Sequence, residues 1–148
     1  MLCNLDENYK EKCANYWDTN MKNFKIEKID DTIKLNKVTK IRKFKLKKIG
    51  QDITNNEKEK IIFQIHLTCW PDHSIPDDAY NEIINIIKIV DKLKEDKPVV
   101  VHCSAGIGRT GTFISIYNLY HEILEQINNK NKIEIKFSIM NLVRKLKE

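Results

Sequence analysis

The sequence contains little glycine and proline, and most of what it has falls in two short segments. It holds four glycines and three prolines in 148 residues. Three of the glycines lie within residues 106–111, and two of the prolines, Pro71 and Pro76, stand close together. A chain this poor in both residue types uses them where the backbone adopts an unusual conformation. We therefore expect two specialised loops, at residues 69–78 and 103–111.

The sequence also lacks the cysteine patterns of disulfide scaffolds and zinc sites. Its four cysteines are scattered and form no Cys-x-x-Cys pair: Cys3, Cys13, Cys69 and Cys103. His66 and His73 stand near Cys69, but these pairs have no further partner to complete a ligand set. We interpret Cys3, Cys13 and Cys69 as buried structural thiols in a reducing compartment. The sequence predicts no metal and no cofactor.

Long apolar runs and a strong charge excess are absent as well. The first 12 residues are polar and lack the core of a signal peptide, and no run approaches the roughly 20 apolar residues of a membrane span. Apolar residues make up 41% and charged residues 32%, as in a globular domain. The net charge of +5 suits an anionic substrate but does not indicate nucleic acid. We expect a single domain with neither a membrane span nor a nucleic-acid partner.

Hydrophobic alternation predicts several strands. Two strands of an antiparallel meander are expected within residues 24–49, with a turn at Asp30-Asp31. A more central strand is expected at residues 61–68, after a polar turn at 50–60. A short buried strand is expected at Val99–Val101. The basic run Arg42–Lys48 is expected to be a solvated edge that discourages further strand pairing.

Apolar residues at helical spacing predict three helices. They are expected from a cap at Asp77 or Asp78 to about Glu95, from near Thr110 to Asn128-Asn129, and over about residues 137–147. Together with the strands, they predict the α/β class, with a twisted mixed β-sheet flanked by helices.

The loop after Val99–Val101 carries the strongest chemical pattern. Residues 99–112 read VVVHCSAGIGRTGT, which is an apolar strand, a turn of the form Cys-x5-Arg, and the start of a helix. Such a turn points backbone N–H groups and the positive end of a helix at one place, which forms an anion cradle. Cys103 would lie there as a thiolate, and the planar side chain of Arg109 would hold two phosphate oxygens. An ordinary turn with a buried cysteine is the alternative, which the surrounding glycines disfavour.

The loop at residues 69–78 offers an acid for the same chemistry. A thiolate that attacks phosphorus displaces an oxygen, and a phenoxide with a pKa of about 10 needs a proton to leave. The segment Trp70-Pro71-Asp72-His73 supplies Asp72. Capping of the next helix is the alternative role for Asp72, but Asp77 and Asp78 are better placed for it. Trp70 and Pro71 would then form a rigid hinge for a closing loop.

Three stretches resemble the tyrosine-specific, cysteine-dependent protein tyrosine phosphatases. HCSAGIGRTGTF at residues 102–113 resembles the family signature. WPDHSIP at residues 70–76 resembles the mobile acid loop of the family, with Ser74 where glycine is usual. Met1-Leu2, Glu7 and KCANYW at residues 12–17 resemble a stretch of the form ML…E…KCxxYW. The resemblance runs over nearly the whole chain, in one order, and is loose only between residues 18 and 63.

The resemblance implies a role for each matching residue. Cys103 would be the nucleophile that forms a phosphocysteine, Arg109 the phosphate clamp, and Asp72 the general acid and then base. Thr110 would donate its hydroxyl to the Cys103 sulfur, and His102 would hold the loop and lower the thiol pKa. The other implied site residues are the substrate-binding Ser104, Ala105, Gly106, Ile107 and Gly108, the supporting Glu7 that orients Arg109, Lys12 that approaches the acid loop, and Trp70 and Pro71 of that loop.

The resemblance also implies that residues 1–148 form a partial catalytic domain. Family domains are considerably longer, and the upstream loop that grips the phosphotyrosine ring has no counterpart here. The glutamine that orients the hydrolytic water would lie beyond Glu148. We therefore expect an incomplete set of sheet strands and open sheet edges.

Two functions remain open at this point. The first is hydrolysis of phosphotyrosine in proteins through a phosphocysteine. The second is a phosphotyrosine-binding module with little turnover, because the domain is partial. A dual-specificity or lipid phosphatase is disfavoured, since the acid loop and the KCxxYW stretch belong to the tyrosine-specific branch. The expected partners are phosphotyrosine-containing proteins, and the expected location is cytoplasmic, which an internal domain of a receptor would share.

Overall fold

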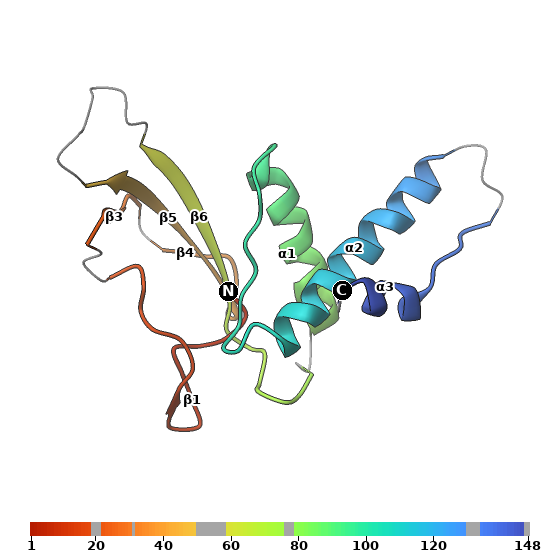
Figure 1. Ribbon diagram of the computed structural model, residues 1–148, viewed down its shortest axis with the longest axis horizontal. Coiled ribbons are helices and arrows are strands. Elements are labelled where there is room, and N and C mark those ends of the chain that lie inside the picture. Colours follow the sequence, from red (N-terminus) through yellow and green to blue (C-terminus); the bar gives the residue numbers. More distant parts are fainter. Residues whose placement is uncertain (19–21, 31, 50–58, 76–78, 130–133, 147–148) are drawn as a thin grey trace.

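The computed structural model describes residues 1–18, 22–30, 32–49, 59–75, 79–129 and 134–146, and it separates a sheet from a group of helices (Figure 1). The elements in chain order are β1 (Asp6–Glu7), β2 (Lys10–Glu11), β3 (Phe24–Lys28), β4 (Ile33–Lys34), β5 (Thr39–Lys48), β6 (Lys60–Leu67), α1 (Ala79–Lys94), α2 (Gly108–Asn128) and α3 (Ile139–Lys145). The sheet lies on one side of α1, and α2 and α3 lie on the other (Figure 1). The α/β class is therefore confirmed.

The sheet is organised around β5. Strands β3, β4 and β6 all pair with β5 in antiparallel register, and β1 and β2 form a separate hairpin. The prediction that residues 61–68 form the more central strand is therefore wrong, although β6 lies at that position. The physical reason is that β5 has described partners along both of its edges, whereas β6 pairs with a described strand only on the β5 side.

The expectation of a solvated edge at Arg42–Lys48 is also wrong, because this run lies in β5. Phe44 on β5 is only 4% exposed, and it lies opposite Ile62 of β6. The neighbouring lysines reach carboxylates: Lys45 and Lys47 both pair with Glu59, at 2.9 and 2.6 Å. Long lysine stems can cover apolar surface while their ammonium groups stay hydrated, so a basic run is compatible with a central strand.

The N-terminal segment links the sheet to the loop before α2. The amino group of Met1 donates to the carbonyl of Ile65 at 2.8 Å, and the N–H of Leu67 donates to the carbonyl of Met1 at 3.0 Å. The N–H of Leu2 donates to the carbonyl of His102 at 2.9 Å. Residues 1–3 thus lie between β6 and the segment that carries Cys103.

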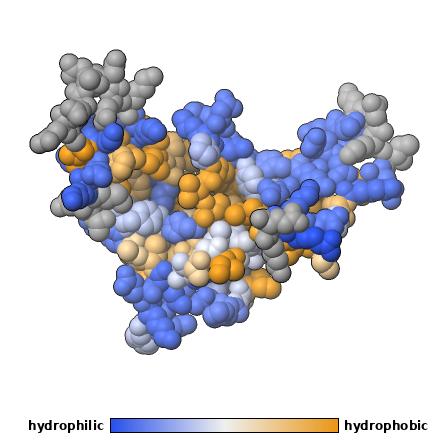
Figure 2. Space-filling model, viewed as in Figure 1, coloured by the Kyte–Doolittle hydropathy of each residue, from blue (hydrophilic) through white to orange (hydrophobic). Residues whose placement is uncertain are grey.

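The buried strand expected at Val99–Val101 is not formed. Val99 is 44% exposed and Val100 is 85% exposed, and the segment has no strand pairing in the described part of the chain. The carbonyl of the neighbouring His102 accepts one hydrogen bond, from the N–H of Leu2. A single backbone hydrogen bond is not the repeated pairing that defines a β-strand in a sheet. Figure 2 shows apolar surface in the middle of the face where this extended segment runs beside α1 in Figure 1.

The three expected helices are present. In α1 the side chains of Ile83, Ile86, Ile87 and Val90 are buried on one face, as their spacing predicts. Helix α2 begins two residues before the expected start and ends at Asn128, and α3 lies inside its expected range. The predicted cap at Asp77 or Asp78, Asp31, and residues 50–58 of the polar turn predicted at 50–60 lie outside the described residues, while Lys60 of that turn belongs to β6. Among the described helices, none combines the length and apolar character needed to cross a bilayer.

The hydrophobic core lies where the N-terminal segment, the end of β6, α1 and the start of α2 meet. Its buried members are Met1, Leu2, Cys3, Leu67, Trp70, Ile83, Ile86, Ile87, Val90, Cys103 and Phe113. Cys103 and Trp70 belong to this core, although both come from the loops with unusual composition. The two candidate functional loops are therefore anchored by apolar burial.

Substitution of Ile87 tests the role of α1 in this core. The Ile87 side chain is 0% exposed, so Ile87→Ala removes buried methyl groups and leaves a cavity. We expect a loss of about 2–5 kcal/mol in the free energy of unfolding, measured by urea denaturation. The exposed neighbour Lys88 supplies the control, since Lys88→Ala should change this free energy little. Equal effects of the two substitutions would contradict the described position of α1.

Candidate active site

The loop before α2 has the backbone geometry of an anion cradle. Gly106 has φ +75°, a left-handed conformation that favours glycine, and the space around it is open. The conformation, not crowding, therefore explains this glycine. Ile107 precedes α2 and provides no side-chain cap to its first N–H groups. Unpaired N–H groups at the start of a 21-residue helix favour a bound anion.

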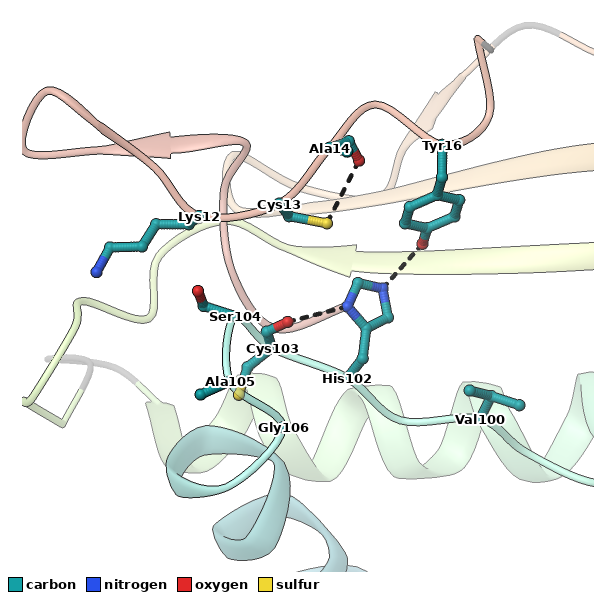
Figure 3. A pocket seen from close by; sticks show the side chains of 10 residues that line it. All are labelled: Lys12, Cys13, Ala14, Tyr16, Val100, His102, Cys103, Ser104, Ala105 and Gly106. Carbon is teal, nitrogen blue, oxygen red and sulfur yellow. Dashed lines mark hydrogen bonds between the residues drawn. The ribbon is translucent and has the colours of Figure 1, made fainter. Parts of the chain in front are cut away.

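Cys103 lies in this cradle with a lowered thiol pKa. Burial alone would raise the pKa of Cys103, but the Thr110 hydroxyl, the N–H groups of Thr110 and Gly106 and the charge of Arg109 together lower it. The Thr110 hydroxyl is buried and has no partner of standard geometry in the described residues, so it remains available to the sulfur. Figure 3 shows the Cys103 sulfur directed toward the loop and away from the ring of His102. These contacts favour a thiolate.

Arg109 joins three segments that are far apart in the sequence. The side chain is 7% exposed. Its Nη1 donates to Glu7 Oε1 at 2.7 Å and to the Trp70 carbonyl at 2.9 Å, and its Nη2 donates to Asp72 Oδ1 at 3.4 Å. The β1–β2 hairpin, the acid loop and the start of α2 are therefore held together by one guanidinium.

Asp72 is ionised in this arrangement. The pKa of its carboxyl is lowered, first by the hydrogen bond from Lys12 Nζ to Oδ2 at 2.5 Å and then by the charges of His73 and Arg109, which outweigh desolvation. The loop around Asp72 is fixed by the Trp70 indole, which donates to the carbonyl of Ser74 at 3.0 Å. His73 has φ +56°. The loop thus turns sharply just after the acid.

A hydrogen-bond chain leads from the sheet to the loop. Gln64 Nε2 on β6 donates to the Tyr16 hydroxyl oxygen at 2.8 Å. The Tyr16 hydroxyl lies 2.9 Å from His102 Nε2, and His102 Nδ1 lies 3.1 Å from the carbonyl of Cys103 (Figure 3). In the sequence, Tyr16 is marked only as part of the KCANYW stretch, and Gln64 stands inside an apolar run. Nothing in the sequence indicates that a glutamine in the middle of an apolar strand belongs to this series of hydrogen bonds.

A surface pocket of about 600 Å³ lies between the β1–β2 hairpin and the Cys103 loop. It is lined by Lys12–Ala14 and Tyr16 from one side and by Val100 and residues 102–106 from the other (Figure 3). Arg109 and Asp72 do not line it. The pocket therefore lies beside the anion cradle.

The structure brings most of the implied site residues together. Cys103, Arg109 and Thr110 share the loop and the first turn of α2, while Glu7, Trp70 and Asp72 contact Arg109, and Lys12 contacts Asp72. Ser104, Ala105, Gly106 and Gly108 lie in the exposed part of the loop. Pro71 and Ile107 are also exposed.

One group of side chains in the described residues could hold a metal ion. The ligand atoms of Cys3, Cys13 and His102 lie within 4.8 Å of one another. No sequence pattern indicates this group, because its members come from three separate segments. Cys69 and its sequence neighbours His66 and His73 do not form such a group in the described part of the chain.

Comparison with known proteins agrees with this geometry. The model of the family "Protein-tyrosine phosphatase" matches residues 1–148. The chain is 33% identical over 144 residues to receptor-type tyrosine-protein phosphatase alpha of Mus musculus. The aligned region covers 91% of this chain and 16% of the mouse protein. The chain therefore belongs to the protein-tyrosine phosphatase family.

Solved structures support the same fold. The crystal structure of the catalytic domain of human protein tyrosine phosphatase non-receptor type 18 matches 99% of this chain with a TM-score of 0.81 at 24% identity. A structure described as PTPN18 in complex with HER2-pY1196 phosphopeptides matches 99% of it with a TM-score of 0.79 at 24% identity. The chain covers 50% and 48% of these solved chains. It therefore corresponds to about half of the solved domain.

Removal of the Thr110 hydroxyl tests the origin of the low thiol pKa. Because this hydroxyl contributes to lowering the pKa of Cys103, Thr110→Val should raise that pKa. The measurement is the rate of iodoacetamide alkylation of Cys103 as a function of pH, followed by mass spectrometry. The midpoint should move to higher pH in this variant.

Thr112 provides the matched control for this experiment. It is exposed, and its hydroxyl donates to the carbonyl of Gly108 at 3.1 Å. Thr112→Val should leave the alkylation midpoint where it is in the unmodified protein. An unchanged midpoint in Thr110→Val would show that this hydroxyl does not act on the sulfur.

Proposed function

We propose that the chain hydrolyses phosphotyrosine in proteins through a phosphocysteine intermediate. The observation that carries this proposal is the meeting of Cys103, Arg109 and Asp72 at one cradle, where Arg109 acts on the thiol and contacts the acid. Membership of the family supports the reaction class. The phosphopeptide complex of the structurally similar PTPN18 supports the substrate class.

The first step transfers the phosphoryl group to sulfur. The Cys103 thiolate attacks phosphorus and forms an S–P bond, while the bond from phosphorus to the tyrosine oxygen breaks. Asp72, protonated at that stage, gives its proton to the departing oxygen. The guanidinium of Arg109 and the loop N–H groups bind the equatorial oxygens and stabilise their charge.

The second step returns the enzyme to its starting state. Asp72 is now a carboxylate and takes a proton from a water molecule, whose oxygen attacks phosphorus. The S–P bond breaks, inorganic phosphate leaves, and Cys103 is again a thiolate. The Thr110 hydroxyl stabilises that thiolate as a leaving group through the same interaction that lowers the pKa of Cys103.

The acid role of Asp72 requires a change in its surroundings. Without substrate, Lys12 and Arg109 hold the pKa of Asp72 below its usual value. A phosphate dianion in the cradle adds negative charge beside the carboxylate and competes for Arg109. Both effects raise the pKa of Asp72 and favour its protonated form.

Capture of phosphotyrosine without turnover is the second candidate. It is favoured by the ionised state of Asp72, whose Oδ2 lies 2.5 Å from Lys12. If this pair persists with substrate bound, the leaving oxygen receives no proton from Asp72.

We also propose a cytoplasmic location, including the internal domain of a receptor, because a thiolate nucleophile needs a reducing compartment.

Activity toward an aryl phosphate separates these two candidates. The protein should hydrolyse para-nitrophenyl phosphate without added metal, and Cys103→Ser should abolish turnover. Asp72→Ala should lower kcat by about 10²–10⁴-fold, the usual contribution of a general acid, because the leaving phenoxide loses its proton source. Binding of a phosphotyrosine peptide, measured by calorimetry, should persist in Asp72→Ala. Peptide binding by the unmodified chain with no hydrolysis would select the second candidate.

Lys12 should control the pH dependence of this activity. Its hydrogen bond is the largest cause of the lowered pKa of Asp72, so Lys12→Met should raise that pKa. An acid with a raised pKa stays protonated to higher pH, and the basic limb of the pH–kcat/KM profile should therefore move to higher pH. Lys10→Met on the same hairpin is the control, since Lys10 is exposed. A shift to lower pH, or the same shift in both variants, would contradict the role of Lys12.

A further inference from the structure

The group Cys3, Cys13 and His102 brings two thiols and an imidazole to one point behind the candidate active site. Cys3 comes from the N-terminal segment, Cys13 follows β2, and His102 precedes Cys103. Their ligand atoms lie within 4.8 Å of one another. We propose that Cys3, Cys13 and His102 bind one Zn²⁺ ion.

The ligand types and their spacing fit zinc. Thiolate sulfur and imidazole nitrogen are the ligands that Zn²⁺ takes in proteins, at about 2.3 Å for sulfur and about 2.0 Å for nitrogen. Tetrahedral ligands at these lengths lie roughly 3.5–4 Å apart. The three side chains therefore need only small inward movements to reach coordination distance. A water molecule would complete the tetrahedron, as in zinc sites with three protein ligands.

The hydrogen bonds of His102 also suit a metal ligand. The carbonyl of Cys103 can only accept, so His102 Nδ1 at 3.1 Å carries the proton. In the neutral ring, Nε2 then has the lone pair. A histidine that binds a metal through one nitrogen commonly donates its other N–H to a backbone carbonyl, and His102 already has that second contact.

Coordination would displace one hydrogen bond of His102. Nε2 lies 2.9 Å from the Tyr16 hydroxyl, which would have to move aside for the metal. The Tyr16 oxygen would keep its bond from Gln64 Nε2 at 2.8 Å. The Cys13 thiol donates to the carbonyl of Ala14 at 3.4 Å, and a thiol is a weak donor whose contact is easily exchanged.

The pocket beside the active site gives an ion access to this group. Cys13 and His102 are half-buried and line the pocket (Figure 3). Cys3 does not line it and is only 1% exposed. The Cys103 sulfur lies in the same picture but is directed away from the His102 ring. Zinc at the proposed site thus needs no bond to the catalytic sulfur. Zinc binding at this site does not rest on the proposed function.

Zinc binding to the full 148-residue protein tests the proposal. The protein, kept reduced with a phosphine, is titrated with Zn²⁺ in competition with a chromophoric chelator. We expect one ion per chain, and Cys13→Ser should lower the affinity at least about 100-fold, since even outer contacts of a metal site contribute 10–100-fold. Cys69→Ser is the matched control, because Cys69 lies outside the group. Cys103→Ser should retain binding, which separates this site from the catalytic sulfur.

A spectroscopic measurement identifies the ligands directly. Co²⁺ in place of Zn²⁺ should give a thiolate-to-metal charge-transfer band in the unmodified protein, in Cys69→Ser and in Cys103→Ser. The band should weaken or disappear in Cys13→Ser and in Cys3→Ser, with circular dichroism showing that each variant is folded. Cys13→Ser is the primary variant because its side chain is only half-buried.

Three results would overturn the proposal. The first is an unchanged zinc affinity in Cys13→Ser. The second is loss of the ion in Cys103→Ser, which would place it at the catalytic sulfur. The third is a disulfide between Cys3 and Cys13 that persists in the presence of the phosphine, detected by peptide mapping, because it would remove both thiolate ligands.

Discussion

The buried guanidinium of Arg109 is the interaction on which the site depends. A cation that is 7% exposed needs partners for its N–H groups, and Arg109 finds them in residues separated from it by 102, 39 and 37 positions. The partners are Glu7, the Trp70 carbonyl and Asp72. Because one charge binds all three, the hairpin, the acid loop and the cradle cannot move independently. The site is therefore assembled by a long-range electrostatic contact at the edge of the apolar core.

A second set of contacts fixes the cradle to the sheet. The chain from Gln64 through Tyr16 and His102 ends on the carbonyl of Cys103, and the N–H of Leu2 donates to the carbonyl of His102. These interactions hold the backbone at His102 and Cys103, whereas Arg109 holds the segment after them. The sulfur of Cys103 thus lies between two anchored points. This rigidity suits a loop whose N–H groups must be preorganised for an anion.

The sequence predicted the site better than the sheet, and the reason is physical. The loops were found because scarce glycine and proline mark local conformations, and Gly106 with its positive φ is such a position. The helices were found because their periodicity is local. Strand order depends on partners far away in the sequence, so the central place of β5 and the unpaired state of Val99–Val101 could not be predicted. The grouping of Cys3, Cys13 and His102 escaped for the same reason.

The contacts of Arg109 also suggest how substrate binding and acid catalysis are linked. Nη1 holds the two short structural contacts, at 2.7 and 2.9 Å, while Nη2 has only the longer contact to Asp72 at 3.4 Å. A phosphate that approaches Arg109 therefore competes with its weakest partner and leaves the links to Glu7 and Trp70 intact. The displaced Asp72 loses one of the cations that lower its pKa and gains an anionic neighbour. In the proposed reaction, binding of the dianion would thus favour the protonated form of Asp72 that the leaving group requires.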